Sequence, residues 1–327
     1  MSLSLKFLSN ARSLYYAAIL LLVVAMAGCR GGAPVATNGT SAPPATLLSE
    51  TEVLLANLQA NETGEPSQFP SPKLLPQPSN DRDWLPELAT LAYAEKQGDE
   101  LTIHNVRNAE FLTYRDCLVD YYDKTYDLTR LQTVDFIVIP FADNPAIAHT
   151  MLSFGFGEGE YVCVSAEVRL EKGESYDAAV GLFGQFELIY VIADERDLVR
   201  ARTEHRNCDV YIYRTKATPE QARRLFLDVL KRVNQLRDKP EFYDTFRNNC
   251  TTNIVRHINT ISPGKIPYDF RILLPGFADQ LAYELGLIDN SLPYAEVKRR
   301  ARVNEIAHRY KDDPQFSAKI RGENVLR

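Results

Sequence analysis

One cysteine of this sequence has the surroundings of a catalytic nucleophile. Cys250 lies in a polar run that leads into an apolar stretch, Arg247-Asn248-Asn249-Cys250-Thr251-Thr252-Asn253. Asn and Thr favour the start of a helix, so the run predicts a helix with Cys250 in its first turn. Unpaired backbone N–H groups and the positive end of the helix dipole favour a thiolate there, and the same N–H groups can stabilise an oxyanion. The pattern therefore indicates thiol chemistry at Cys250.

A cysteine nucleophile needs a general base, and His149 is the histidine best placed to supply it. His149 begins an expected strand after the turn Asp143-Asn144-Pro145 and precedes glycines that allow close approach of the backbone. A strand histidine that faces a cysteine at a helix N-terminus is the arrangement of papain-like thiol enzymes. The pattern alone fits a packed core histidine at least as well.

The other four histidines fit the role of base less well. His257 follows Cys250 by seven residues, which is about 10 Å along one helix and too far for a hydrogen bond, so we expect a structural role. His205 and His308 fall in charged stretches that are expected to be exposed. His104 lies in a strand-like segment and stays open as an alternative.

The remaining cysteines leave disulfide bonds as an alternative in an exported chain. Cys117 lies in an apolar segment, Cys163 in a strand pattern and Cys208 just before a strand, where free buried thiols are also common. The chain has no CxxC pair and no His or Cys pair with ligand spacing. The acidic run Asp194–Asp197 includes an arginine as its own counter-ion. We therefore expect no metal and no other cofactor.

The first 28 residues predict a lipoprotein signal peptide. Lys6 and Arg12 precede an apolar run over residues 15–26 that is too short to span a bilayer comfortably. Two small residues stand before Cys29, as in the bacterial lipobox, with a methionine where leucine is usual. Cys29 is thus the expected lipidation site, and Arg30 in place of Asp favours the outer membrane over retention in the inner one. An uncleaved membrane anchor is the alternative.

Composition divides the remainder into three parts. Residues 29–80, which are rich in Pro, Ser and Thr, predict a tether with one short amphipathic stretch over residues 47–58. Residues 81–290 are globular in composition, and residues 291–327 form a basic tail with an expected helix over 295–310. That helix fits an exposed, solvated element or, alternatively, contact with anionic lipid.

The net charge argues against nucleic acid as a partner. It is −6 for the whole chain and becomes −8 once Lys6 and Arg12 leave with the signal peptide. Contacts to phosphates need an excess of basic residues.

Five segments of the globular part have the β-branched, aromatic or alternating pattern of strands. They cover residues 133–141, 149–156, 161–170, 185–193 and 209–214. The connections before residue 218 are too short for helical crossovers, so the sheet is expected to be mostly antiparallel. Thr218-Pro219-Glu220 then opens a helix, and another begins near Cys250. The predicted class is α+β, with a mostly antiparallel sheet and flanking helices.

Several blocks together resemble the Lnb N-terminal periplasmic domain family over residues 80–290. They are the segment from His149 to Phe156, Ala193-Asp-Glu-Arg-Asp-Leu, Pro240-Glu-Phe-Tyr, Asn248 to Asn253, and Leu274-Pro-Gly. The resemblance implies a circularly permuted papain-like fold, related to the NlpC and lecithin:retinol acyltransferase groups, in which the histidine precedes the cysteine. It also implies an enzyme that acts on lipoproteins or phospholipids at the membrane surface, without nucleic acid or metal.

The resemblance assigns roles to residues of this chain. Cys250 becomes the nucleophile and His149 its general base. Glu167, in preference to Ser165, becomes the group that orients the histidine, because strand alternation puts both on one face; a surface carboxylate is the alternative for Glu167. Backbone N–H groups stabilise the oxyanion, with support from the neighbouring polar residues Asn248, Asn249 and Thr251.

The resemblance also implies a reaction, in which an acyl chain passes from a phospholipid to the amine of a lipoprotein N-terminus through a thioester at Cys250. Lnb itself has a hydrophobic membrane portion after this domain, whereas this sequence has no apolar run of spanning length there. An NlpC-type cysteine hydrolase of cell-wall peptides or lipids, and a non-catalytic envelope lipoprotein, therefore remain alternatives. An apolar groove at Cys250 would favour the transferase, and a polar cleft with Arg or Lys would favour the peptidase.

Overall fold

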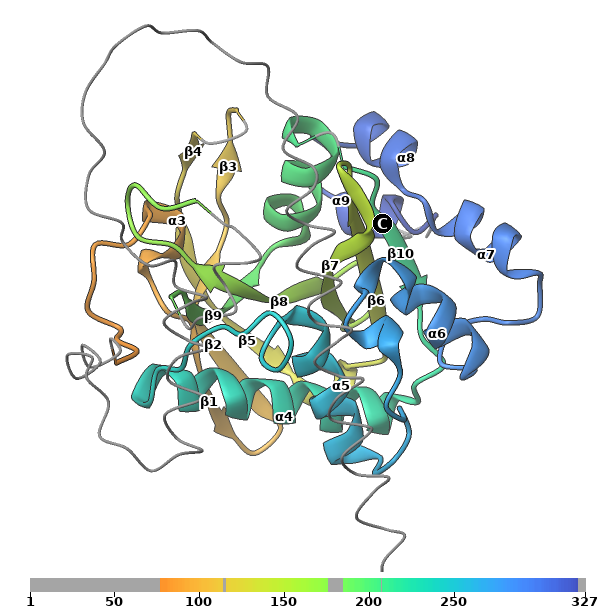
Figure 1. The fold of residues 1–327 in the computed structure, drawn as a ribbon, viewed down its shortest axis with the longest axis horizontal. Coiled ribbons are helices and arrows are strands. Elements are labelled where there is room, and N and C mark those ends of the chain that lie inside the picture. Colours follow the sequence, from red (N-terminus) through yellow and green to blue (C-terminus); the bar gives the residue numbers. More distant parts are fainter. Residues whose placement is uncertain (1–76, 114–115, 176–184, 207, 323–327) are drawn as a thin grey trace, which may run out of the picture. The chain divides into compact units, whose positions relative to one another are not determined.

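A sheet of eight strands forms the centre of the fold (Figure 1). Its members are β1 (Tyr93–Gln97), β2 (Glu100–Arg107), β5 (Tyr121–Asp127), β6 (Thr133–Phe141), β7 (Asn144–Gly155), β8 (Tyr161–Arg169), β9 (Glu187–Ala193) and β10 (Tyr211–Arg214). The strand order is β1-β2-β9-β8-β7-β6-β10, with β5 paired to β2 off this path. Among the described strands β2 and β9 run parallel and the other neighbours are antiparallel, which confirms the predicted mostly antiparallel sheet with flanking helices.

The structure is a computed structural model that describes residues 77–113, 116–175, 185–206 and 208–322. From Pro78 onward the chain forms one unit. The expected signal peptide, the lipidation site Cys29 and the tether up to residue 76, with its stretch over residues 47–58, lie outside the described residues.

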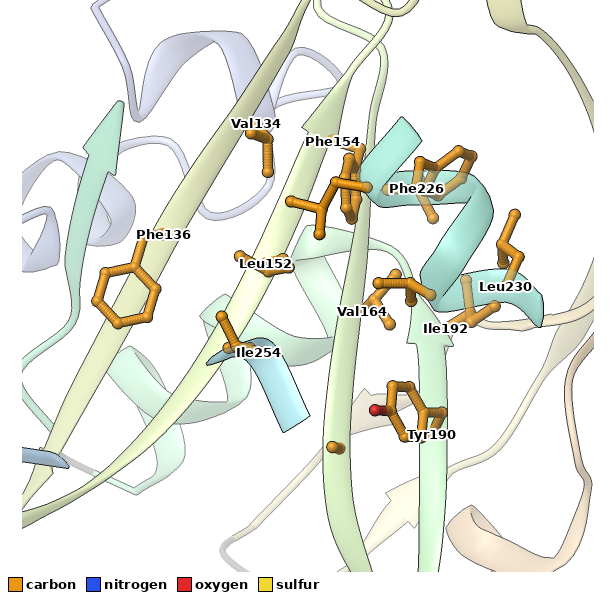
Figure 2. Close-up of a cluster of buried hydrophobic side chains, with 14 of the residues drawn as sticks. Val134, Phe136, Leu152, Phe154, Val164, Tyr190, Ile192, Phe226, Leu230 and Ile254 are labelled. Carbon is orange, nitrogen blue, oxygen red and sulfur yellow. The ribbon is translucent and has the colours of Figure 1, made fainter. Parts of the chain in front are cut away.

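Two helices cover one face of the sheet. α4 (Pro219–Asp238) begins where the sequence predicts, because the Thr218 side chain accepts from the N–H of Gln221 and the Gln221 side chain accepts in return from Thr218 N–H. Figure 2 shows Phe226 and Leu230 of α4 and Ile254 of α5 (Cys250–Ile261) beside side chains from the strands. This packing fixes the axis of α5, and therefore its first residue, against the sheet.

The opposite face is covered largely by the C-terminal part of the chain. α8 (Asn304–Arg309) and α9 (Phe316–Lys319) bury side chains against Ile137, Met151 and Ile189 of the sheet. The expected helix over residues 295–310 is two helices, α7 (Tyr294–Ala301) and α8. The two helices are separated at Val303, whose N–H donates to the carbonyl of Val210, the residue before β10. This hydrogen bond replaces the one that Val303 would make in a continuous helix.

A buried ionic cluster joins the C-terminal segment to the sheet. Arg321 lies among Asp135 of β6, Glu195 and Ser153, donates to all three side chains, and stacks over the ring of Tyr161. Asp135 and Glu195 are buried, and Arg321 balances their charge together with Arg214, which also bonds Asp135.

The remaining elements are short. They are α3 (Pro86–Ala89), α6 (Ala278–Glu284), the two-stranded pair β3 (Glu110–Phe111) and β4 (Cys117–Leu118), the 3₁₀ turns η1 (Leu128–Arg130), η4 (Phe270–Ile272) and η5 (Pro275–Phe277), and the π-helix η3 (Arg196–His205).

Candidate active site

The sheet opens where the candidate residues lie. The β7–β8 ladder runs from Gly155↔Tyr161 to Leu152↔Val164 and ends there, although both strands continue beyond that pair. β7 stays paired with β6 to Ala148 and, after a register shift, at Asn144, and β8 stays paired with β9. Ser165 directly follows Val164 on β8, and His149 lies three residues before Leu152 on β7, so both lie beyond the last pair of the β7–β8 ladder.

Cys250 is the first residue of α5, as the sequence predicts. Asn249 is the N-cap; its side chain accepts from the N–H of Thr252, and the Thr252 hydroxyl accepts from the N–H of Asn249. The N–H groups of Cys250 and Thr251 have no hydrogen-bond partner among the described residues. Two donors at the positive end of a helix thus remain next to the sulfur, which is the requirement for stabilising an oxyanion.

The structure brings Cys250 and His149 together. Burial of Cys250 acts against the thiolate, but the hydrogen bond to His149, the charge of His149 and hydrogen bonds from Thr150 outweigh it and lower the thiol pKa to about 7. Near neutral pH about half of the thiol is therefore ionised. Thr150 also bonds the hydroxyl of Thr251, at 2.9 Å. Thr150 was not predicted as a site residue, because strand alternation puts it on the face opposite to that of its neighbour His149.

A chain of hydrogen bonds through Ser165 to Glu167 holds the Nε2 side of the His149 ring. Its Nε2 lies 2.6 Å from Ser165 Oγ, and Ser165 Oγ donates to Glu167 Oε1 over 2.8 Å. The only hydroxyl proton of Ser165 is thereby used, so Nε2–H of His149 donates to Ser165 and Nδ1 is left for the thiol. Ser165 thus bonds the histidine directly, whereas Glu167 Oε1 is 3.6 Å from Nε2 and acts mainly through the serine.

Glu167 is held ionised by cations on two other elements. Burial favours its neutral form, but the charges of Arg202, His149 and Arg107 hold the pKa of Glu167 well below its usual range. Arg202 of η3 donates to Glu167 Oε1 over 3.1 Å. No sequence pattern pointed to Arg202, because its side chain reaches β8 only through the winding of the π-helix.

The two asparagines expected to support the oxyanion have other partners. The amide of Asn249 donates to the carbonyl of Thr245, and its oxygen caps α5. The amide of Asn248 donates to the carbonyl of Phe242, and its oxygen accepts from Asn253. Both side chains therefore shape the loop before Cys250, while Thr251 lies beside the thiol, with 3.8 Å between its hydroxyl and the sulfur.

A small cavity of about 10 Å³, the size of one water molecule, lies beside Cys250. Its lining is mainly apolar and holds no Lys or Arg; it consists of Thr150, Leu152, Val164, Ala166, Tyr190, Val229, Cys250, Asn253, Ile254 and His257.

The other histidines have partners away from the thiol. His257 bonds Asp228 through Nδ1 and the hydroxyl of Tyr190 through Nε2, and burial lowers its pKa. This buried group ties α5 to α4 and β9, in keeping with the structural role expected for it. Of the remaining histidines, His104 bonds Asp123, and His308 bonds Glu204.

Cys117, Cys163, Cys208 and Cys250 are all free thiols, and no group of His, Cys, Asp and Glu in the described residues is arranged to hold a metal ion. The three acids of the run Asp194–Asp197 take partners from distant parts of the chain instead of the neighbouring Arg196. Asp194 accepts from Tyr122, Glu195 from Arg321, and Asp197 from Arg107.

Residues 118–276 match the family model described as the Lnb N-terminal periplasmic domain, which confirms the resemblance. The matched segment contains His149, Ser165, Glu167 and Cys250. No similar protein was found among curated proteins or solved structures. Across the described residues no helix is both long and apolar enough to cross a membrane.

Proposed function

Because the chain carries an Lnb N-terminal periplasmic domain, we propose that it is a periplasmic thiol acyltransferase. It moves an acyl chain from a phospholipid to an amine acceptor, such as the N-terminus of a lipoprotein, through a thioester at Cys250. The observation that carries the proposal is the pairing of a free thiol of pKa about 7 at a helix N-terminus with a histidine fixed by Ser165 and Glu167.

The proposed first step forms the thioester. The Cys250 thiolate attacks the ester carbonyl carbon, and the N–H groups of Cys250 and Thr251 stabilise the oxyanion. When the carbon–oxygen bond breaks, His149 gives its proton to the leaving oxygen, and lysophospholipid departs.

In the second step an amine attacks the thioester carbonyl. His149 takes the proton of the amine, the carbon–sulfur bond breaks, and an amide and the free thiolate result. Throughout, Ser165 and Glu167 keep Nδ1 of the histidine directed at the sulfur and stabilise the imidazolium.

The surroundings of Cys250 support an acyl substrate over a peptide. The side chains next to the sulfur are mainly apolar, which suits an acyl chain, and the cavity they line is the size of one water molecule. A non-catalytic role predicts a disulfide-bonded Cys250 or one far from His149, whereas the thiol is free and its pKa is lowered by that histidine. The order of His149 before Cys250 is that of a permuted papain-like fold, which stays a prediction.

We further propose that lipidated Cys29 anchors the protein in a bacterial membrane, with the outer membrane favoured by Arg30. Such an anchor would keep the domain at the surface that holds its substrate.

Intact-protein mass spectrometry tests the proposal. The full chain is incubated with phospholipid vesicles, beside Cys250→Ser and the control Cys117→Ser, and lysophospholipid is assayed in the same tube. We expect one added acyl mass that neutral hydroxylamine removes, present in the control and absent without Cys250. If a reduced, alkylatable Cys250 gives neither adduct nor lysophospholipid, the transferase is refuted, and the cell-wall peptidase and the non-catalytic envelope lipoprotein take its place.

A further inference from the structure

Four exposed aromatic side chains belong to two segments that pack on each other, the β6–β7 turn and the η4–η5 segment. Six large apolar side chains are exposed in the described residues, and four of them are Phe141, Tyr268, Phe270 and Phe277, here called the aromatic patch. Phe141 lies at the turn between β6 and β7, and the other three lie in and around η4 and η5. The other two exposed side chains, Leu112 and Leu118, belong to the separate β3–β4 pair.

Close backbone packing holds the aromatic patch against the strand that carries His149. η5 lies on β7 so tightly that a Cβ atom at Gly276 would be 1.8 Å from the carbonyl oxygen of Pro145. Pro145 precedes His149 by four residues, which is about 13 Å along a strand. The patch thus lies at the end of β7 nearest the candidate site.

The same segment is also attached to the helix that carries Cys250. Ile266, Ile272 and Leu281 form a small buried cluster, and Val255 and Ile258 of α5 pack against it. Isoleucines on either side of Tyr268 and Phe270 therefore point inward while the two aromatic side chains point outward. The outward pair is held in place by this cluster and is not a frayed end.

The segment that displays the aromatic side chains carries no net charge. Between Ile266 and Phe277 the charged residues are Asp269 and Arg271, and they bond each other through paired contacts of 2.9 Å. Arg271 also bonds Glu284. The charged side chains of this segment are thus bonded to each other or to Glu284, and aromatic rings around such paired charges suit the boundary between lipid chains and headgroups.

We propose that the aromatic patch inserts into the interfacial region of a phospholipid bilayer and brings the gap between β7 and β8 to the membrane surface. The insertion itself does not require catalytic turnover. The role of the insertion in delivering a phospholipid ester to Cys250 rests on the proposed function.

Tryptophan fluorescence tests the insertion directly. The chain has one tryptophan, Trp84, which is buried and can stay as a constant background. Phe270→Trp is compared with Leu118→Trp, a matched control, because the two side chains are 61% and 60% exposed. Both changes are made in the full chain with Cys250→Ser, and vesicles of phosphatidylethanolamine and phosphatidylglycerol with brominated acyl chains are added.

We expect a blue shift and quenching of the Phe270→Trp signal and neither for Leu118→Trp. Equal quenching of both probes, or no quenching of either, overturns the proposal; a concentration-dependent blue shift without lipid would instead assign the patch to a contact between copies of the chain. These readouts need no catalysis, so they stand even if the proposed function fails.

A second arm connects the patch to turnover. Tyr268→Ser with Phe270→Ser should lower turnover of vesicle phospholipid at least about tenfold, because two ring burials are lost. Turnover of a water-soluble short-chain ester should stay unchanged. Equal losses on both substrates would mean that the patch supports the fold and not the membrane contact.

Discussion

Replacing His149 by alanine is expected to raise the pKa of Cys250 from about 7 to near its ordinary value of 9.0. Burial, which raises this pKa, and the hydrogen bonds of Thr150, which lower it, both remain in the variant, whereas the hydrogen bond and the charge of the histidine are lost. The change corresponds to about 3 kcal/mol of lost thiolate stabilisation.

The effect on reactivity is smaller than the effect on ionisation. At pH 7 the thiolate fraction falls from about one half to about 1%. A thiolate of higher pKa is a better nucleophile, which offsets about eightfold of the loss in rate. Alkylation by iodoacetamide at pH 7 should therefore slow by about sixfold, and the midpoint of its pH profile should move to near 9.

The assay is the alkylation rate of the peptide that contains Cys250, measured by mass spectrometry from pH 5 to pH 10. Cys117 in the same chain serves as an internal control, because burial already raises its pKa. An unchanged midpoint in His149→Ala would refute the claim that the histidine ionises the thiol. A midpoint that moves equally for Cys117 would point to general unfolding instead.

Three further predictions concern the groups around the site. Ser165→Ala should slow thioester formation about tenfold and leave the urea midpoint nearly unchanged, since it removes one hydrogen bond from His149; equal rates would show that the serine has no part in orienting the ring. Gly276→Ala should lower the free energy of unfolding by about 1–3 kcal/mol, measured by urea titration, because the new methyl meets backbone; wild-type stability would mean that η5 does not lie on β7. Arg321→Ala should lower the free energy of unfolding by about 3–5 kcal/mol at pH 7, since buried Glu195 loses its bonded cation and buried Asp135 is left with Arg214. Arg321 lowers the pKa of Glu195 below its ordinary 4.5, so this part of the stability is present above pH 4.5 and is lost as the pH falls through the lower, folded value. The difference in the free energy of unfolding between wild type and variant should therefore become smaller below pH 4.5. A difference that does not change with pH would contradict the ionic explanation.

Local signals predicted the elements that position the nucleophile and its base. The capping residues Thr218 and Asn249 stand at the starts of α4 and α5, and β-branched alternation predicted β6 and β8 closely. Such signals act over a few residues, so one sequence is enough to find them.

Contacts between distant segments could not be predicted in this way. The pairing of Arg202 with Glu167 depends on the register of the π-helix, and the burial of Arg321 depends on how the C-terminal segment crosses the sheet. The basic composition after residue 290 suggested a solvated tail, but one of its cations belongs to the interior. The number of charged residues in a segment does not reveal which cation pairs with a buried carboxylate.

The ionic cluster under the sheet also sets an order of events during export. Asp135 and Arg321 are 186 positions apart, so β6 leaves a translocation channel long before its counter-charge does. Until residue 321 follows, closing the sheet would bury Glu195 without this cation and leave Asp135 with Arg214, and we expect the emerging strands to stay open and hydrated. The cluster thereby makes final closure of the sheet wait for residue 321. A polypeptide truncated before residue 321 would persist in the open form that proteases remove.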